Sequence, residues 1–403
     1  MHASKHINSL PDFENTTIAF DSKSDSALKK SSWLFSMMNK PILVNLGSKL
    51  ALWALNNKLP FVELITKKTV FDHFCGGESL TDCQLAISQL ANQNVQTVLD
   101  YGAEVKQSES DFNSSMEEML RAISFAAQHQ NVAVVSFKIT ALAKIELLEK
   151  VQAKLTLSES EKEAYQHMLK RLSFVGQSAE VNKVTLFVDA EESWIQGVID
   201  SLVTKLQQQY NKDRATVYNT FQMYRHDRLD YLKASFKEAQ SKEYILAAKI
   251  VRGAYMEKER ARALSNGYPS PIQKDKAATD KDYNLAIRFC VENYQQIASY
   301  NASHNQESNM LQAELMVSNG IPRNHSNLNF SQLYGMSDQI TFNLSSIGFN
   351  ATKYMPYGQL KEVIPYLIRR AQENTAVSGE MGREYQMILM ELTRRRTKRD
   401  RIQ

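Results

Sequence analysis

Short β-rich runs alternate with helical stretches through most of the chain, and this alternation restricts the fold more than any other feature. Strands that alternate with helices form βαβ units, whose strands run parallel. Eight such runs follow one another from residue 95, with a polar helical excursion at residues 143–180: Val95–Asp100, Val132–Ile139, Val184–Asp189, Thr216–Met223, Leu246–Arg252, Ile297–Ser303, Leu328–Leu333 and Ala351–Met355. The pattern predicts an α/β fold, a (β/α)8 barrel of the TIM type.

The chain has 403 residues, which is more than one barrel of about 250 residues requires. Residues 1–90 precede the runs and have a helical pattern, with an apolar stripe at Leu46, Leu50 and Trp53. Such a stripe either packs on a neighbouring domain or lies on a membrane surface. We therefore predict an N-terminal helical region 1–90, a barrel 91–385 and a basic C-terminal tail 386–403.

Polar residues end most of the β-rich runs, and in a (β/α)8 barrel the carboxyl ends of the strands hold the active site. Each residue alone is explained by a structural role, but so many charges exceed what packing requires. Lys138 lies in an apolar run and needs an anion, for which Asp189 at the next run is the natural partner. The other polar residues at or just after the run ends are Glu191, Glu192, Gln222, Tyr224, Arg225, Lys249, Arg252, Tyr255, Ser303, His304, Asn305, Gln332, Tyr334 and Tyr354, and apolar Leu333 lies between two of them.

Two adjacent arginines follow the last run, on a segment with helical spacing. Arg369 and Glu373 are four residues apart and therefore share a helix face with each other. Guanidinium groups bind a carboxylate through two parallel hydrogen bonds, so Arg369 and Arg370 suggest a site for a small carboxylate. A solvated charged face is the alternative interpretation of the same residues.

This segment resembles the last strand and helix of the proline dehydrogenase family, whose members are FAD enzymes built on a (β/α)8 barrel. The resemblance extends over about residues 95–385. The residues that carry it here are Tyr354, Pro356, Gly358, Tyr366, Leu367, Arg369, Arg370, Glu373 and Asn374.

The resemblance implies a role for each strand-end residue. On the cofactor side, it implies that Gln222 hydrogen-bonds the isoalloxazine edge, and that Lys249 lies where some relatives have an arginine near flavin N5. The remaining FAD residues would be Arg252, Gly253, Ala254, Ser303, His304 and Asn305. On the substrate side, Lys138 and Asp189 would be paired charges, and Tyr255 and Leu333 would line the proline pocket. Tyr354 would cap the proline ring, Arg369 and Arg370 would clamp its carboxylate, and Glu373 would orient the arginines.

The activity that the resemblance implies is oxidation of L-proline to Δ1-pyrroline-5-carboxylate, with electrons passing from FAD to a quinone. Hydroxyproline is an alternative substrate. The resemblance implies that relatives selective for hydroxyproline replace the ring-capping tyrosine with a smaller residue, so Tyr354 favours proline. A second alternative is a non-catalytic helical protein that binds anionic surfaces, but it leaves the strand-end charges unexplained.

Charge and cysteine content narrow the partners and the compartment. The net charge is +4, of which residues 394–403 contribute +5, so the rest of the chain is at −1 and nucleic acid is not expected as a partner. The basic tail is either a frayed terminus or a segment attracted to an anionic membrane. The three cysteines are too few for a disulfide framework and predict a reducing compartment, and their spacing does not predict a zinc site. The polar N-terminus has no signal-peptide core, so we expect a cytoplasmic protein. Peripheral contact with the inner face of a membrane stays open.

Overall fold

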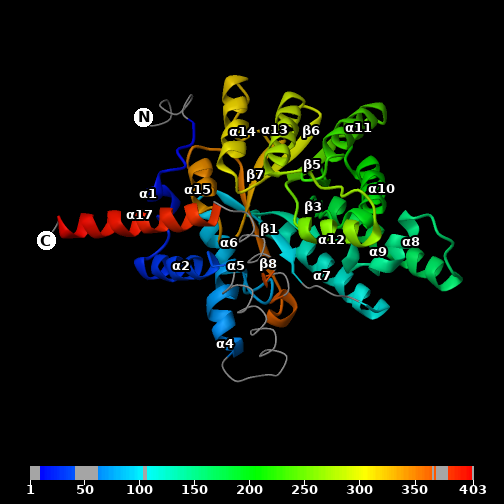
Figure 1. The fold of residues 1–403 in the computed structure, drawn as a ribbon, viewed down its shortest axis with the longest axis horizontal. Coiled ribbons are helices and arrows are strands. Elements are labelled where there is room, and N and C mark those ends of the chain that lie inside the picture. Colours follow the sequence, from blue (N-terminus) through cyan, green and yellow to red (C-terminus); the bar gives the residue numbers. More distant parts are fainter. Residues whose placement is uncertain (1–9, 41–61, 103–106, 365–366, 369–379, 402–403) are drawn as a thin grey trace.

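A closed barrel of eight parallel strands, paired in chain order, forms the centre of the molecule (Figure 1). The computed structural model describes residues 10–40, 62–102, 107–364, 367–368 and 380–401. The strands are β1 (Val95–Tyr101), β2 (Val132–Phe137), β3 (Thr185–Val188), β4 (Val217–Gln222), β5 (Leu246–Val251), β6 (Ile297–Ala302), β7 (Leu328–Leu333) and β8 (Ala351–Tyr357). The barrel closes between β8 and β1, where Val98 is in register with Tyr354. The predicted (β/α)8 fold is confirmed.

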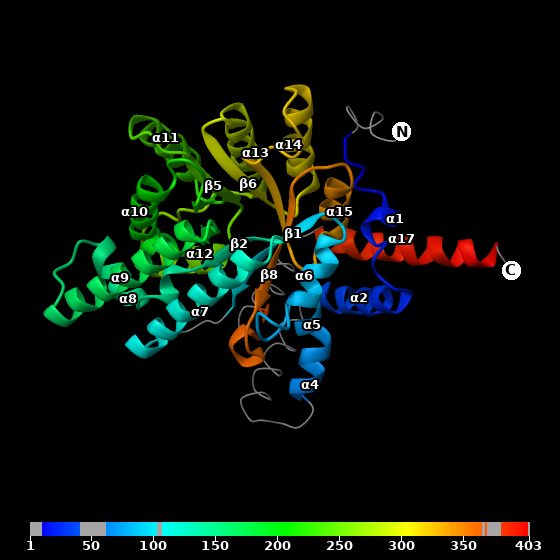
Figure 2. The ribbon, with the colours of Figure 1, turned by 180° about the vertical axis from the view of Figure 1, so that it is seen from behind.

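The helices between the strands surround the barrel on its outside (Figures 1 and 2). The polar excursion predicted after the second run corresponds to α8 and α9, which begin after a 3-10 turn at Ile139–Ala141. The outer helices are α7 (Glu109–Gln128), α8 (Ile145–Gln152), α9 (Glu159–Val181), α10 (Ser193–Tyr210), α11 (Arg228–Ser241), α12 (Met256–Asn266), α13 (Lys276–Glu292), α14 (Gln306–Ser318) and α15 (Asp338–Ser346).

Apolar side chains fill the interior of the barrel. Phe187, Tyr218 and Tyr300 meet edge to face, with ring centroids 4.7 to 5.4 Å apart. Val98 and Tyr354 belong to the same buried cluster. Because alternate residues of each strand face inward, this packing leaves no open pore. The polar groups at the carboxyl ends of the strands therefore lie above a packed core.

The described part of the N-terminal region is helical, as predicted, and it packs on the barrel. Its elements are α1 (Thr16–Ala19), α2 (Asp25–Met38), α4 (Val62–Thr66), a π-helical turn (Lys67–Phe71), α5 (Asp72–Phe74) and α6 (Gln84–Ala91). Phe71 and Phe74 share a buried cluster with Met336 of the β7–α15 loop and with Val363 after β8. The apolar stripe around Leu46–Trp53 lies outside the described residues.

Strand β8 continues two residues beyond the predicted end at Met355. Pro356 and Tyr357 stay paired with β1, because proline loses only a backbone N–H and its carbonyl can still accept. Gly76 donates its N–H to the Pro356 carbonyl at 2.9 Å, and Gly77 forms a parallel bridge with Tyr357. Gly76 and Gly77 thus lie beside the last two residues of β8.

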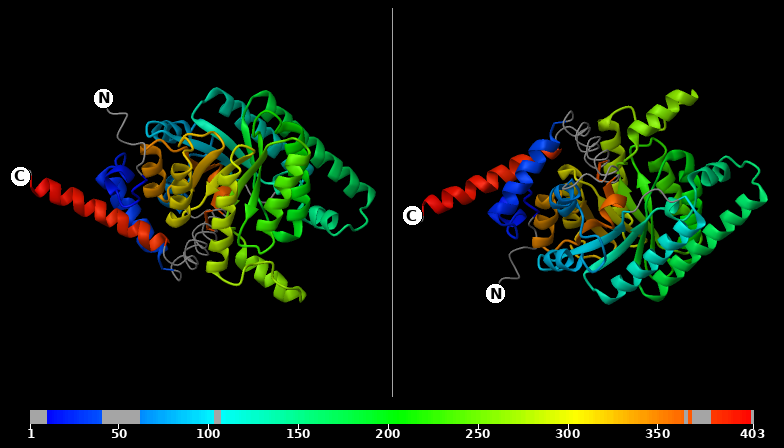
Figure 3. Two further views of the ribbon diagram at one scale, coloured as in Figure 1. Left: turned by 90° about the horizontal axis from the view of Figure 1, so that it is seen from above. Right: turned by 90° about the horizontal axis from the view of Figure 1, so that it is seen from below.

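The basic tail is part of α17 (Glu380–Asp400), which lies alongside α2 (Figure 3). The predicted boundary after residue 385 falls inside this helix. Arg395 donates hydrogen bonds to the carbonyls of Phe20 and Lys23 at 2.8 and 2.7 Å, and forms an ion pair with Asp25. The frayed-end interpretation is therefore wrong for the described residues, since acids and carbonyls of the N-terminal region bind the basic side chains. Among the described helices, none has the length and apolar character needed to cross a membrane.

Candidate active site

Asp189, the residue that follows β3, receives polar groups from three other strands. Its Oδ1 forms an ion pair with Lys249 of β5 and accepts a hydrogen bond from Ser136 of β2 at 3.0 Å. Its Oδ2 accepts a hydrogen bond from the hydroxyl of Tyr354 of β8 at 2.7 Å. The backbone N–H of Asp189 donates to the Phe137 carbonyl, which continues the β2–β3 pairing by one residue. The carboxylate is thus fixed at the C-terminal end of the barrel.

The surroundings of Asp189 keep its carboxyl group ionised. Burial acts to raise the pKa of Asp189, but the ion pair with Lys249 and the hydrogen bond from Tyr354 outweigh it and lower the pKa. Lys249 is itself buried, and its ammonium lies 5.0 Å from the ring centroid of Phe187 and 5.1 Å from that of Tyr354. The result is a buried ion pair enclosed by two aromatic rings.

Two lysines act on Asp189: Lys138, as the sequence analysis expected, and Lys249. Lys249, which the resemblance placed near the flavin, forms an ion pair with Asp189, the acid that the sequence analysis paired with Lys138. Lys138 begins the 3-10 turn after β2, and its charge lowers the pKa of both Asp189 and Asp100. Lys138 and Lys249 therefore both act on the acidic centre formed by Asp100 and Asp189.

Asp100 at the end of β1 is a residue of this centre that the sequence analysis missed. Burial, with the charge of Asp189, raises the pKa of Asp100 to about 7, against the opposite effects of Lys138 and Tyr354. The signal was present, because Asp100 ends the first β-rich run as Asp189 ends the third. Two acids with pKa values shifted in opposite directions are typical of functional sites.

Replacing Asp100 by asparagine should change how stability depends on pH. An unfolded aspartate has a pKa of about 3.9, so the folded protein holds the extra proton between pH ~4 and ~7. Stability from this group is therefore lost as pH rises through that window, and Asp100→Asn removes the loss. The free energy of unfolding of the variant, relative to wild type, should rise between pH ~4 and ~7 and then level off. Denaturant titrations across pH measure it.

A variant whose stability should depend on pH in the opposite direction serves as the control. Buried Glu391 of α17 has its pKa lowered to about 2, because hydrogen bonds from Arg394 and Arg395 outweigh burial. Its contribution is present above pH ~4.3 and is lost on acidification. Glu391→Gln should therefore be most destabilising at neutral pH. A difference between Asp100→Asn and wild type that is constant over the whole range would contradict the assigned pKa.

Gln222 and Gly253 lie at the ends of β4 and β5, where a cofactor was expected. The Gln222 amide donates to the Glu191 carbonyl at 3.1 Å, and its Oε1 is buried without a hydrogen-bond partner among the described residues. Gly253 has φ of +130°, and a Cβ there would lie 2.4 Å from the ring of Tyr224. Only glycine fits this contact and this backbone. Ala254 follows it and is partly buried.

Arg252 is held by a set of protein contacts. It donates to Asp280 at 2.8 Å, to the Ser303 hydroxyl at 2.6 Å and to Ser308 at 3.0 Å. Its guanidinium also lies 4.3 Å from the ring centroid of Tyr283. The side chain is still 21% exposed, so one face stays accessible to a ligand. Arg252 thus connects the end of β5 to the loop after β6.

The loop Ser303–Asn305 joins β6 to α14 and contains three predicted cofactor residues. Ser303 receives the backbone N–H of Asn305 at 3.0 Å, and Asn305 caps α14 by accepting from the Ser308 N–H at 2.9 Å. Nδ1 of His304 lies 2.8 Å from the hydroxyl of Ser337. The loop is therefore fixed at the N-terminus of a helix, a position that favours anions.

Leu333 and Tyr255, the predicted pocket residues, lie at the ends of their elements. Leu333 is in register with Tyr354 across β7 and β8, and it packs on the interior cluster. Tyr255 is the N-cap of α12 and is partly buried. Both therefore lie at the C-terminal face. Arg369, Arg370 and Glu373 lie outside the described residues.

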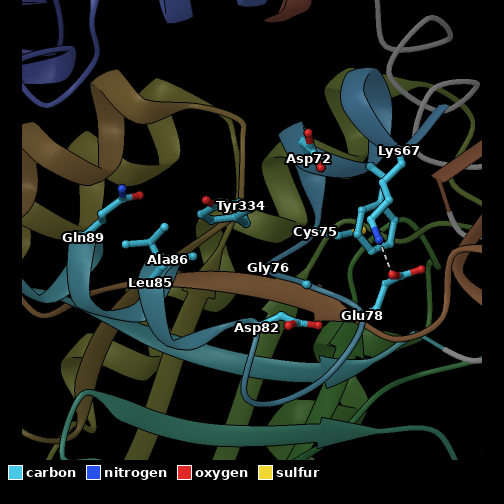
Figure 4. Close-up of a pocket in the computed structure, with 12 residues that line it drawn as sticks. Lys67, Asp72, Cys75, Gly76, Glu78, Asp82, Leu85, Ala86, Gln89 and Tyr334 are labelled. Atoms are coloured by element: carbon cyan, nitrogen blue, oxygen red, sulfur yellow. Dashed lines mark hydrogen bonds and ion pairs between the residues drawn. The ribbon is translucent and has the colours of Figure 1, made fainter. Parts of the chain in front are cut away.

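A separate cavity of about 450 Å³ lies between α6 and the segment 67–82 (Figure 4). An ion pair between Lys67 and Glu78 crosses it, and Leu85 and Gln89 of α6 line one side. Tyr334, next to Leu333, also faces it. None of the described residues predicted to bind substrate or cofactor lines this cavity, so it is distinct from the site around Asp189.

Comparison with known proteins agrees with this geometry. A family model described as proline dehydrogenase matches residues 83–383. The carbapenem antibiotics biosynthesis protein CarD of Pectobacterium carotovorum subsp. carotovorum is 32% identical, over 80% of this chain and 83% of its own. Mitochondrial proline dehydrogenase 2 of Arabidopsis thaliana is 30% identical, over 95% of this chain and 90% of its own.

Solved structures share the fold. Proline utilization A (PutA) from Bdellovibrio bacteriovorus, crystallised after inactivation by N-propargylglycine, superposes with a TM-score of 0.70 at 22% identity. The match covers 90% of this chain and 38% of that one, so this chain spans well under half of the PutA chain. The family match over most of the chain, and relatives that align over most of both lengths, show that this chain is an enzyme of the proline dehydrogenase family.

Proposed function

We propose that the enzyme oxidises L-proline to Δ1-pyrroline-5-carboxylate, with FAD as its cofactor and a quinone as the final electron acceptor. Family membership supports oxidation of proline. The observation that carries the proposal is the carboxylate of Asp189, which is ion-paired to Lys249 and hydrogen-bonded by Tyr354. Side chains from several strands converge on it at the face where barrel enzymes hold their substrates.

The described residues fit FAD in two respects. Oε1 of Gln222 is a buried acceptor without a partner among the described residues, which suits an N–H of the isoalloxazine edge. Nε2 of Gln306, in the first turn of α14, is a buried donor that likewise has no hydrogen-bond partner among the described residues. It lies beside His304 and Asn305 at the N-terminus of a helix of 13 residues, where phosphate oxygens bind well. Arg252, Gly253, Ala254 and Ser303 would complete the cofactor site, with Lys249 near the flavin.

Oxidation of proline removes a hydride from C5 and a proton from the ring nitrogen, and a C=N bond forms. FAD, when bound, supplies the hydride acceptor. The part of the protein is to hold the ring and its charges. Asp189 and Lys249 fix the electrostatic surroundings, while Leu333, Tyr255 and Tyr354 exclude water and bulkier rings. Lys138 supplies a further positive charge beside the acids.

The substrate carboxylate requires a cation, and we propose Arg369 and Arg370 for this role. Guanidinium pairs fix a carboxylate by position as well as by charge, which would orient C5. Glu373, one helical turn after Arg369, would hold that arginine by an ion pair. This part of the proposal rests on the sequence and on the family.

Transfer of electrons to a quinone implies contact with a membrane surface, and we propose that the enzyme is a cytoplasmic protein that binds there peripherally. The last turns of α17 present exposed basic residues, among them Arg396 and Lys398. Trp33 and Met37 of the neighbouring α2 are exposed apolar side chains. A basic surface with an exposed tryptophan suits an anionic interface.

Changing Tyr354 tests the identity of the substrate. Tyr354→Ser removes the ring and should raise the ratio of hydroxyproline to proline kcat/KM by about tenfold or more, because the pocket then admits the extra hydroxyl. Tyr354→Phe is the matched control. It removes only the hydroxyl, which binds Asp189 and Ser136, so both substrates should slow by a similar factor. If Tyr354→Ser leaves the ratio of the two substrates at the wild-type value, Tyr354 does not cap the ring.

A further inference from the structure

Glu384 in the first half of α17 is a buried carboxylate whose contacts lead toward the proposed cofactor site. It is 3% exposed. Both of its oxygens accept from one donor, the backbone N–H of Ser337, at 2.8 and 2.9 Å. Ser337 belongs to the turn between β7 and α15, and α15 lies close to α17 (Figures 1 and 2). The last helix therefore binds the barrel through this carboxylate.

Ser337 has a backbone conformation that serine rarely adopts. Its φ is 53° and its ψ is 41°, the left-handed region, and it is buried. Such a residue persists only where its surroundings hold it, and residues of this kind gather at functional sites. The side chain of Ser337 lies 2.8 Å from Nδ1 of His304. A continuous chain of contacts thus runs from Glu384 through Ser337 to His304.

Further charges fix the same turn from other sides. Asp338 forms ion pairs with Lys353 of β8 at 2.8 Å and with Lys23 of the N-terminal region at 2.5 Å. Lys353 also donates to the carbonyls of Met336 and Leu333. Most of the turn is therefore held without Glu384, which alone among the described acids accepts the Ser337 N–H. Loss of Glu384 should displace Ser337 but leave the rest of the turn in place.

We propose that Glu384 is a positioning residue for the FAD site: it fixes the turn at Ser337, and the Ser337 hydroxyl in turn fixes the His304 ring against the cofactor. The proposal rests on the proposed function, because it requires FAD beside His304. A histidine bound through one ring nitrogen has a defined tautomer and orientation at the other. The C-terminal helix, which continues beyond the family match at residue 383, thereby becomes part of the cofactor site.

A purely structural role is the rival explanation, since a carboxylate near the N-terminus of α15 also stabilises that helix. The two roles differ in what they change. A structural role lowers the melting temperature and leaves the affinity of the folded protein for FAD unchanged. A positioning role weakens FAD binding and alters the visible circular dichroism of the bound flavin.

The test compares Glu384→Gln with Glu391→Gln, titrating FAD into protein from which bound flavin has been removed. Glu391 is a matched control, because it is buried in the same helix and its ion-pair partners Arg394 and Arg395 belong to that helix. Glu384→Gln replaces one of the two acceptors by a donor. It should raise the Kd for FAD about tenfold or more, and change the flavin dichroism. Glu391→Gln should leave both at wild-type values.

Ser337→Ala and the double variant Glu384→Gln/Ser337→Ala complete the experiment. Because both residues act through His304, the double variant should bind FAD no more weakly than the weaker single variant. Additive losses of FAD affinity, or a Kd for Glu384→Gln equal to that of Glu391→Gln, would overturn the inference. The proposed function would still stand in that case, provided that the wild-type protein binds FAD. If Glu384→Gln does not fold, wild-type affinity in Ser337→Ala overturns it instead. Wild-type protein with no affinity for FAD would overturn both.

Discussion

Replacing Asp189 by asparagine should lower kcat/KM for proline by about 100-fold or more, the size of effect seen when one preorganised electrostatic group is removed. The amide cannot neutralise buried Lys249, and because its NH2 group donates and does not accept, either Ser136 or Tyr354 loses its acceptor. Loss of one partner of a buried ion pair should also cost about 3 kcal/mol of stability. Steady-state kinetics and denaturant unfolding measure the two effects.

The stability effect of Asp189→Asn has a defined pH dependence. The pKa of Asp189 is lowered in the folded protein, so its stabilisation is complete above the unfolded pKa of about 3.9 and is lost as pH falls through the folded value. The difference between variant and wild type should therefore shrink on acidification. Glu391→Gln is again the control, since it removes a buried carboxylate far along α17. Kinetic parameters of Asp189→Asn equal to those of this control would remove Asp189 from the site.

Gly253→Ala should destabilise the protein severely and weaken FAD binding. At φ of +130° the new Cβ would lie 2.4 Å from the Tyr224 ring, so either the ring or the backbone between Arg252 and Tyr255 must shift. Overpacking of a buried contact costs about 1–3 kcal/mol, and the unfavourable φ adds about 1–2 kcal/mol. The melting temperature and the Kd for FAD should both respond.

Gly267→Ala separates the two causes. Gly267 ends α12 with φ of +68°, but a Cβ there meets nothing within 4 Å. Its substitution should cost only the backbone contribution of about 1–2 kcal/mol, with unchanged FAD affinity. Equal losses of stability in the two variants would show that the contact with Tyr224 is unimportant.

The sequence predicted the strands well, because β-branched runs between helical segments leave few alternatives. Strand β7 was predicted at its observed bounds, Leu328–Leu333. Strand β8 was predicted to end at Met355, two residues before its observed end at Tyr357. Proline removes one donor, but the carbonyl of Pro356 still pairs with Gly76. Local sequence therefore determines where most strands lie, whereas the C-terminal end of β8 depends on pairing with a segment distant in the sequence.

Side-chain pairing was less predictable than side-chain position. The sequence indicates which residues end the strands, and most of them do lie at one face. It does not indicate which charges meet, because partners are chosen across the barrel mouth. Lys249 of β5, two strands away from β3, forms an ion pair with Asp189 that the sequence analysis did not predict. Asp100 was missed although it follows the same rule.

The C-terminal helix shows how composition can mislead. Six basic residues at the end of a chain suggest an exposed and frayed segment. The spacing of Glu391 to Arg394 and Arg395, at i+3 and i+4, was a signal for a helix that we did not use. Its docking depends on Asp25 and on carbonyls near residue 20, which no local pattern reveals.

The most direct test of the proposed function is a visible absorption spectrum of the purified enzyme, reconstituted with FAD and recorded without oxygen before and after addition of L-proline. We predict a bound-flavin spectrum that bleaches when proline is added, because FAD takes up the two electrons that proline loses. Absence of bound flavin after reconstitution would contradict the cofactor assignment. Bound flavin that stays oxidised with proline would contradict the substrate.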